Sequence, residues 1–139
     1  MTAYSDWDVQ KAVYARLAAS AGVTMLLAGG AASVYDHVPE NSSFPYIMIG
    51  EIAGKPLETV TGGGRDLLLA LHVYSRLSGF KETREIMGAV HAALHDADFA
   101  VAGQNLVLCL EAGSATVLEG DGVTRHGKME FHLVTEPEG

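Results

Sequence analysis

The stretch that decides the fold is Val34–Glu51, VYDHVPENSSFPYIMIGE, together with Leu67–Arg76, LLLALHVYSR. The first segment predicts a short strand over Ala32–Tyr35 and, after a proline-punctuated loop, a second strand over Tyr46–Ile52. The second segment predicts a strand over Leu67–Tyr74, which we expect at the centre of a sheet because both of its faces are largely apolar. These segments carry no nucleophile elbow, metal-ligand set or phosphate loop, so they indicate a scaffold whose work is done by its surfaces.

Between the second and third strands lies Gly54–Arg65, which we expect to be a long, flexible connection with its own proline and a triple glycine. A loop of this length without internal structure tends to be functional, so it is a candidate contact element. The glycines of Gly62–Arg65 resemble a phosphate cradle, but a Walker loop ends in Gly-Lys-Ser or Gly-Lys-Thr and leads into a helix. Here Arg65 and Asp66 lead into a strand, so we interpret the segment as a hairpin tip.

Two amphipathic helices are expected, over Ser5–Ala19 and Gly79–His95, because each segment has one apolar stripe at helical spacing. The stripe residues are Val9, Val13 and Leu17 in the first helix and Ile86, Met87, Val90, Ala93 and Leu94 in the second. Ser5 or Asp6 can cap the first helix. A weaker helical segment follows over Val23–Ala28.

The last third of the chain predicts a buried strand over Leu106–Leu110, a turn at Gly120–Gly122 and a half-buried strand over Lys128–Val134. The element order is therefore α-β-β-β-α-β-β, with short connections that favour antiparallel neighbours. The sequence predicts an α+β fold of two layers, a mostly antiparallel sheet with both amphipathic helices packed on one face. We expect residues 1–139 to form a single domain.

Composition excludes several classes of function. The net charge of the 139 residues is −8 and the lysines and arginines are scattered, so tight nucleic-acid binding is not expected. An acidic surface can still face DNA as the wall of a passage. No apolar run approaches the ~20 residues that span a bilayer. The single cysteine, Cys109, lies in an apolar run, which predicts a buried and inert thiol.

The six histidines raise the question of a metal site. His91 and His95 lie four residues apart in HAALH, but the general-base glutamate of a zinc-protease helix is missing. His72, His126 and His132 fall on or beside predicted strands, and their spacing demands no cross-strand metal. We expect no metal ligand, cofactor or catalytic residue, and no enzymatic activity.

One alternative from a different class remains open. A small enzyme or ligand-binding domain could use Asp36, His37 and His72 in a cleft. That hypothesis requires a well-formed pocket that holds all three side chains within hydrogen-bond reach.

Three segments in order carry a resemblance to a known family. They are VYDHVPENSSFPYIMIGE, then LLLALHVYSR followed by SGFKETREIMGAVHAAL, then DGVTRHGKMEFHLVTE. Together they resemble the tail terminator, or tail-completion, family of siphophage-like particles, prophages and gene transfer agents. The resemblance covers roughly Tyr4–Glu136, nearly the whole chain.

The resemblance implies a structural assembly protein. Such proteins form a homo-oligomeric ring, typically a hexamer, on the head-proximal end of the tail tube. The ring stops tube polymerisation and presents a surface to the head connector, or stopper, protein, while DNA passes through its lumen without specific binding. The implied partners are further copies of the chain, the major tail tube protein and the connector, with no membrane. The implied location is the bacterial host cytoplasm during assembly and then the tail of the particle. We expect Gly54–Arg65 and the edge strand after Pro45 to supply some ring contacts.

A neighbouring role in the particle is the main alternative. A head–tail joining protein or a minor tail protein can have a similar α+β build. Gene order separates these roles, because a terminator is expected just before the major tail protein gene.

Overall fold

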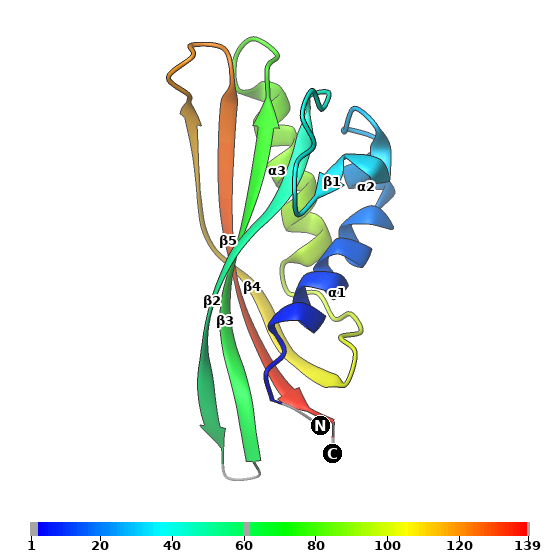
Figure 1. The fold of residues 1–139 in the computed structure, drawn as a ribbon, viewed down its shortest axis with the longest axis vertical. Coiled ribbons are helices and arrows are strands. Elements are labelled where there is room, and N and C mark those ends of the chain that lie inside the picture. The colour runs from blue at the N-terminus through cyan, green and yellow to red at the C-terminus, as the bar shows by residue number, and fades with distance from the viewer. Residues whose placement is uncertain (1–2, 60–61, 139) are drawn as a thin grey trace.

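The computed structural model describes residues 3–59 and 62–138 and shows a five-stranded sheet with helices on one face (Figure 1). The helical elements are α1 (Asp6–Ala18), α2 (Ala21–Thr24), the 3-10 segment η1 (Gly30–Ser33) and α3 (Lys81–Leu94). The strands are β1 (Val34–Tyr35), β2 (Tyr46–Thr59), β3 (Gly62–Ser75), β4 (Gln104–Leu118) and β5 (Arg125–Pro137). The predicted α+β class and its order of strands and amphipathic helices are confirmed.

The strand order is β1-β2-β3-β5-β4, so β3 lies inside the sheet as its two apolar faces predicted. The three long pairings, β2 with β3, β3 with β5 and β4 with β5, are antiparallel, and β1 is parallel to β2. β1 pairs with the start of β2, at Ile47 and Met48. Beyond that point β2 forms one edge of the sheet, and β4 forms the other.

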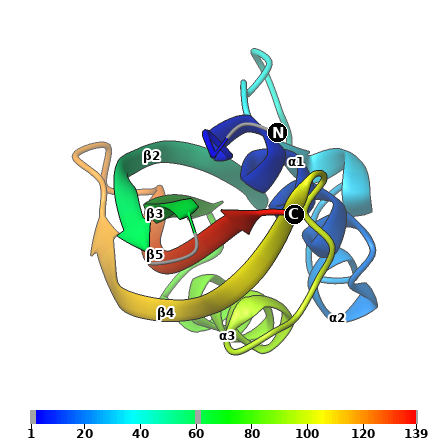
Figure 2. The ribbon, with the colours of Figure 1, turned by 90° about the horizontal axis from the view of Figure 1, so that it is seen from below.

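The core lies between the sheet and the helices. Alternate residues of β3 (Leu67, Leu69, Leu71 and Val73) and of β5 (Met129, Phe131 and Leu133) are buried there, against the predicted stripes of α1 and α3. α3 packs against β3, β4 and β5, and α1 lies beside α3 (Figure 2). Each large side chain buried in this way contributes roughly 1.5–3 kcal/mol. Among the described residues no helix is long and apolar enough to cross a membrane.

The prediction of a long loop over Gly54–Arg65 is wrong. β2 and β3 continue through this segment and pair as far as Thr59 with Gly62, so the connection shrinks to residues 60–61, which lie outside the described residues. Gly64 allows close strand packing here, because a Cβ at this position would lie 2.8 Å from the carbonyl oxygen of Thr135 on β5. Thr135 is far from Gly64 in the sequence, so the local composition gave no sign of this contact. Composition therefore indicated a loop where pairing within the sheet forms a strand.

Three shorter predictions also need correction. Residues 30–33 form η1 where a strand was expected over Ala32–Tyr35, and the Ser33 hydroxyl accepts a hydrogen bond from the Gly29 amide at 2.7 Å. The helix expected over Val23–Ala28 is replaced by the single turn of α2. β4 extends well past Leu106–Leu110, because pairing with β5 carries the strand through small and polar residues.

The start of α1 is held by the sheet. The Ser5 hydroxyl lies 2.6 Å from that of Thr135 on β5, with both residues buried, in place of the predicted cap. Asp6 accepts hydrogen bonds from Arg65 Nε at 2.9 Å and from its Nη2 at 3.3 Å. The Tyr4 ring lies against the same guanidinium, 4.0 Å from its central carbon to the ring centroid. Tertiary contacts therefore replace local capping at this terminus.

Candidate assembly surfaces

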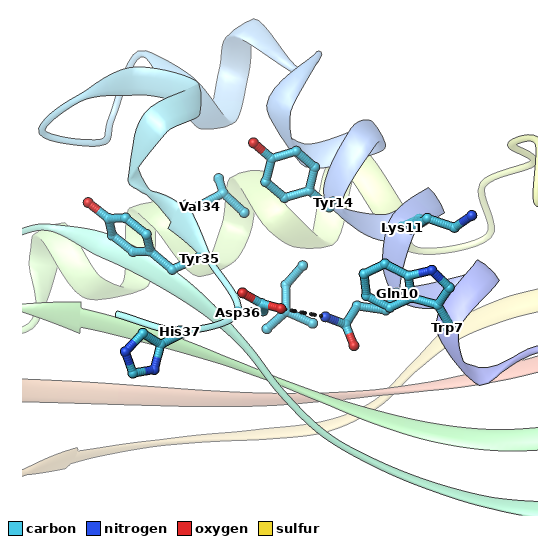
Figure 3. A pocket seen from close by; sticks show the side chains of 9 residues that line it. Trp7, Gln10, Lys11, Tyr14, Val34, Tyr35, Asp36 and His37 are labelled. Atoms are coloured by element: carbon cyan, nitrogen blue, oxygen red, sulfur yellow. Dashed lines mark hydrogen bonds between the residues drawn. The ribbon is translucent and has the colours of Figure 1, made fainter. Parts of the chain in front are cut away.

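A groove with a volume of 310 Å³ opens between α1 and β1 (Figure 3). Its lining residues are Trp7, Gln10, Lys11, Tyr14, Val34, Tyr35, Asp36, His37 and Ile49. Trp7 and Tyr14 lie two turns apart on one side of α1, and Trp7 remains 60% exposed. A large exposed aromatic beside an apolar hollow is typical of a surface that receives a partner's side chain.

Polar side chains tie the two walls of the groove together. Gln10 of α1 donates a hydrogen bond through Nε2 to Asp36 Oδ2 at 3.2 Å, across the gap to the segment after β1. Lys11 Nζ lies 3.3 Å from Asp8 and 5.8 Å from the centroid of the Trp7 ring. Apolar walls with a few hydrogen-bonding groups suit binding.

The alternative site of Asp36, His37 and His72 is not assembled by the fold. Asp36 and His37 line the groove. His72 lies on the face of the sheet opposite the helices, which we call the open face, where its ring nitrogens contact Glu51 and His126. The alternation of side chains along a strand could have predicted that His72 lies on the open face, because the residues on either side of it in β3 point into the core.

The open face carries a cluster of two histidines between two glutamates. His72 Nδ1 lies 2.7 Å from His126 Nε2, His72 Nε2 lies 3.0 Å from Glu51 Oε1, and His126 Nδ1 lies 2.9 Å from Glu119 Oε1. Tyr74 stacks on His126 with ring centroids 4.6 Å apart. The hydrogen bond from His72 lowers the pKa of Glu51, whereas burial and the neighbouring His72 lower the pKa of His126. Sequence reasoning missed this cluster, since its members meet only through the strand register.

The remaining histidine candidates have structural partners. His91 Nδ1 lies 2.7 Å from Glu111 Oε1, and the Glu111 amide donates to His95 Nδ1 at 3.0 Å, which ties the end of α3 to β4. On the open face, His132 Nε2 lies 2.9 Å from Asp66 Oδ1. Within the described residues no group of three histidine, cysteine, aspartate or glutamate side chains could hold a metal ion.

Cys109 is buried in β4, as its apolar surroundings predicted. Burial raises the pKa of its thiol to about 12. The thiol is therefore protonated at neutral pH, and a protonated thiol is a poor nucleophile.

A second surface of interest is the end of the molecule formed by the β3–α3 connection and the β4–β5 turn, far from the two termini (Figure 1). Four large aliphatic side chains are exposed on these segments: Leu77, Val117, Leu118 and Val123. The two segments are joined where Arg76 Nε donates to Thr124 Oγ1 at 3.1 Å. We call this surface the apolar end, and it differs in residues and position from the groove.

The two sheet edges are the third kind of surface. β4 presents an edge of 15 residues with Val107 exposed, and an unpaired edge of this length can accept a strand from another chain. The outer half of β2 contains Pro56, which lacks an N–H group and limits such pairing there.

Comparisons with known proteins agree with the fold. A family model described as "Tail completion protein gp17" matches residues 11–136. A search of curated proteins gives no match. Among solved structures, a chain described as "Virion of native gene transfer agent (GTA) particle" is similar at a TM-score of 0.87 and 24% identity, covering 97% of this chain and 99% of that chain. Because the family model spans nearly the whole sequence, the chain belongs to the tail completion protein gp17 family and has a structural role in a phage-like tail.

Proposed function

We propose that the protein forms a ring on the head-proximal end of a phage-like tail tube, stops tube polymerisation and joins the tail to the head connector. The observation that carries the proposal is the family match over residues 11–136. The whole chain, residues 1–139, acts as one tail-terminator-like domain. It assembles in the cytoplasm of a bacterial host and remains in the tail of the finished particle.

Growth of a tube is templated addition of subunits at an open end. A ring that binds that end and offers a different outer face removes the template and ends growth. Each subunit contributes the same contacts, so weak contacts add up to firm attachment through avidity. The partners are therefore the major tail tube protein on one side of the ring and the connector protein on the other.

A closed ring of head-to-tail subunits needs two different, complementary patches on each copy. The groove beside Trp7 and the apolar end around Leu77 are two such patches, and they lie on different parts of the subunit. The open edge of β4 adds a place where strands of neighbouring copies can pair. The six-membered ring that the sequence resemblance implies is compatible with this arrangement.

The acidic character of the chain suits a passage for DNA. The net charge of the chain is −8 and its lysines and arginines are scattered along the sequence, so a lumen lined by this chain would offer phosphates no basic patch to bind. DNA therefore passes through the ring without specific binding.

Deletion of the gene tests this function. Negative-stain electron microscopy of particles from the deletion strain should show tails of abnormal length and detached, filled heads. Tails of normal length with detached heads would instead support a head–tail joining role. Normal, joined particles would overturn both.

A point variant tests the groove as a ring contact. Complementation of the deletion strain with Trp7→Ala should fail to restore joined particles, because the variant removes the larger and more exposed of the two aromatic rings that α1 contributes to the groove and little of the core. The matched control is Met25→Ala, since Met25 is exposed but lies outside the groove lining. Equal complementation by both variants would exclude the groove as a ring contact.

A further inference from the structure

The open-face cluster makes three close contacts, but two neutral imidazole rings carry only two N–H hydrogens. The three contacts are Glu51 with His72, His72 with His126, and His126 with Glu119, at 3.0, 2.7 and 2.9 Å. Each contact needs one hydrogen between its two heavy atoms. An ionised carboxylate supplies no hydrogen and a neutral imidazole supplies one. With both rings neutral, one of the three contacts would bring two lone pairs together.

The missing hydrogen belongs to the imidazole pair and not to a carboxylate. The side chains of Glu51 and Glu119 are 69% and 40% exposed, so water stabilises their ionised forms. The hydrogen bond from His72 also lowers the pKa of Glu51, which keeps that carboxylate ionised at neutral pH. Two carboxylates that flank a pair of rings, one buried and one half-buried, favour one positive charge between them.

A second extra proton is disfavoured. Burial and the charge on His72 lower the pKa of His126, and Lys128 on β5 acts in the same direction. The other ionisable groups at this site are Tyr46 of β2 and Tyr74 of β3, and burial raises the pKa of both phenols. Both tyrosines are therefore neutral near pH 7. Two interacting sites of this kind take up their protons in separate steps.

We propose that His72 and His126 share one proton beyond those of two neutral rings at neutral pH, and that this proton makes the cluster a pH-sensitive clamp. The clamp joins β2 through Glu51, β3 through His72, β5 through His126 and the β4–β5 turn through Glu119. Loss of the proton at higher pH leaves the contact between the rings unfilled. Entry of a second proton at lower pH places two positive charges within one contact.

The backbone of β2 is shaped to hold this arrangement. Gly50 lies at the irregularity between Ile49 and Ile52, where the pairing of β2 with β3 shifts register. A Cβ at Gly50 would come within 2.7 Å of the His72 ring. The absence of a side chain at Gly50 therefore leaves room for the ring beside the edge strand, in reach of both its partners.

The proton count can be measured directly in the wild-type protein. Imidazole nitrogen chemical shifts should be recorded by NMR between pH 5 and 9 on protein labelled with ¹⁵N in histidine. We expect three protonated nitrogens shared by His72 and His126 at pH 7.5, and release of the third proton in one coupled step as the pH rises. One proton on each ring at pH 7.5, with independent titrations near the usual pKa of about 6.5, would overturn the proposal.

A pair of matched variants separates the clamp from ordinary histidine–carboxylate contacts. Glu119→Gln removes one flanking charge and should lower the pH of proton release by about one unit. Asp66→Asn removes the carboxylate beside His132 on the same face and should leave that release unchanged. A release pH that Glu119→Gln does not move would contradict the proposed role of the glutamates.

Discussion

The two faces of β3 are built from alternate residues of one strand and are stabilised by different forces. The residues that point towards the helices, Leu69 among them, are buried in an apolar core. On the open face Leu68 is 37% exposed and His72 joins a cluster of ionisable groups. The helix-covered face depends on apolar volume, whereas the open face depends on hydrogen bonds and charge. We therefore expect the two faces to respond differently to loss of side-chain volume, to added volume and to pH.

The largest effect is expected from removal of core volume. Leu69→Ala should lower the free energy of unfolding by about 2–5 kcal/mol, because it leaves a cavity between β3 and the helices. Leu68→Ala deletes the same atoms one residue away and should cost no more than about 1 kcal/mol, because its side chain already meets water. Urea unfolding followed by circular dichroism measures both. Equal losses would mean that the open face is covered in solution.

Added volume should test a tightly packed place on the open face, beside the His72 ring. Gly50→Ala should cost about 1–3 kcal/mol, because its Cβ would meet the His72 ring at 2.7 Å and the Ala70 carbonyl oxygen at 3.1 Å. The control is Gly113→Ala in β4, where no atom of the described residues lies within 4 Å of the added Cβ. Thermal unfolding should separate the two variants by several degrees. If Gly50→Ala were as stable as the control, the His72 ring would have moved aside at no cost in stability.

A small gain in the free energy of unfolding is expected from a substitution on the outer side of the helical layer. Gly88 is exposed within α3, and no described atom lies within 4 Å of a Cβ added there. Gly88→Ala should raise the free energy of unfolding by about 0.5–1 kcal/mol, because glycine is a poor helix former. Chemical denaturation measures the gain. A loss of stability would show that this side of α3 is in contact with another copy.

The smallest effect on the free energy of unfolding is expected from a change of pH, and it should arise from His126 on the open face. The pKa of His126 is lowered in the folded state, so below about pH 6.5 the unfolded chain binds more protons than the folded one. The free energy of unfolding should therefore fall as the pH drops from about 6.5 to 5. His126→Gln should flatten that slope. Identical slopes for the His126→Gln variant and the wild type would contradict this assignment.

The sequence by itself determined the framework. Apolar periodicity located α1, α3 and most of the strands, and the apolar faces of Leu67–Tyr74 identified the central strand. Periodicity succeeds there because helix and strand repeats place side chains on faces without reference to the rest of the chain. The order of the three quoted segments indicated the family that the comparisons confirm. The apolar run around Cys109 also predicted that this residue is buried.

Tertiary structure alone decided the features that depend on strand register. The glycines of Gly54–Arg65 indicated a loop, yet they lie in strands because β2 and β3 pair through this segment, and at Gly64 the backbone of β5 comes too close for a side chain. Ser5 suited a helix cap, yet it bonds to Thr135, 130 residues away. His72 and His126 are 54 residues apart and meet only because β3 and β5 pair in one particular register. Contacts of this kind arise from the pairing of distant segments, which no local pattern of residues encodes.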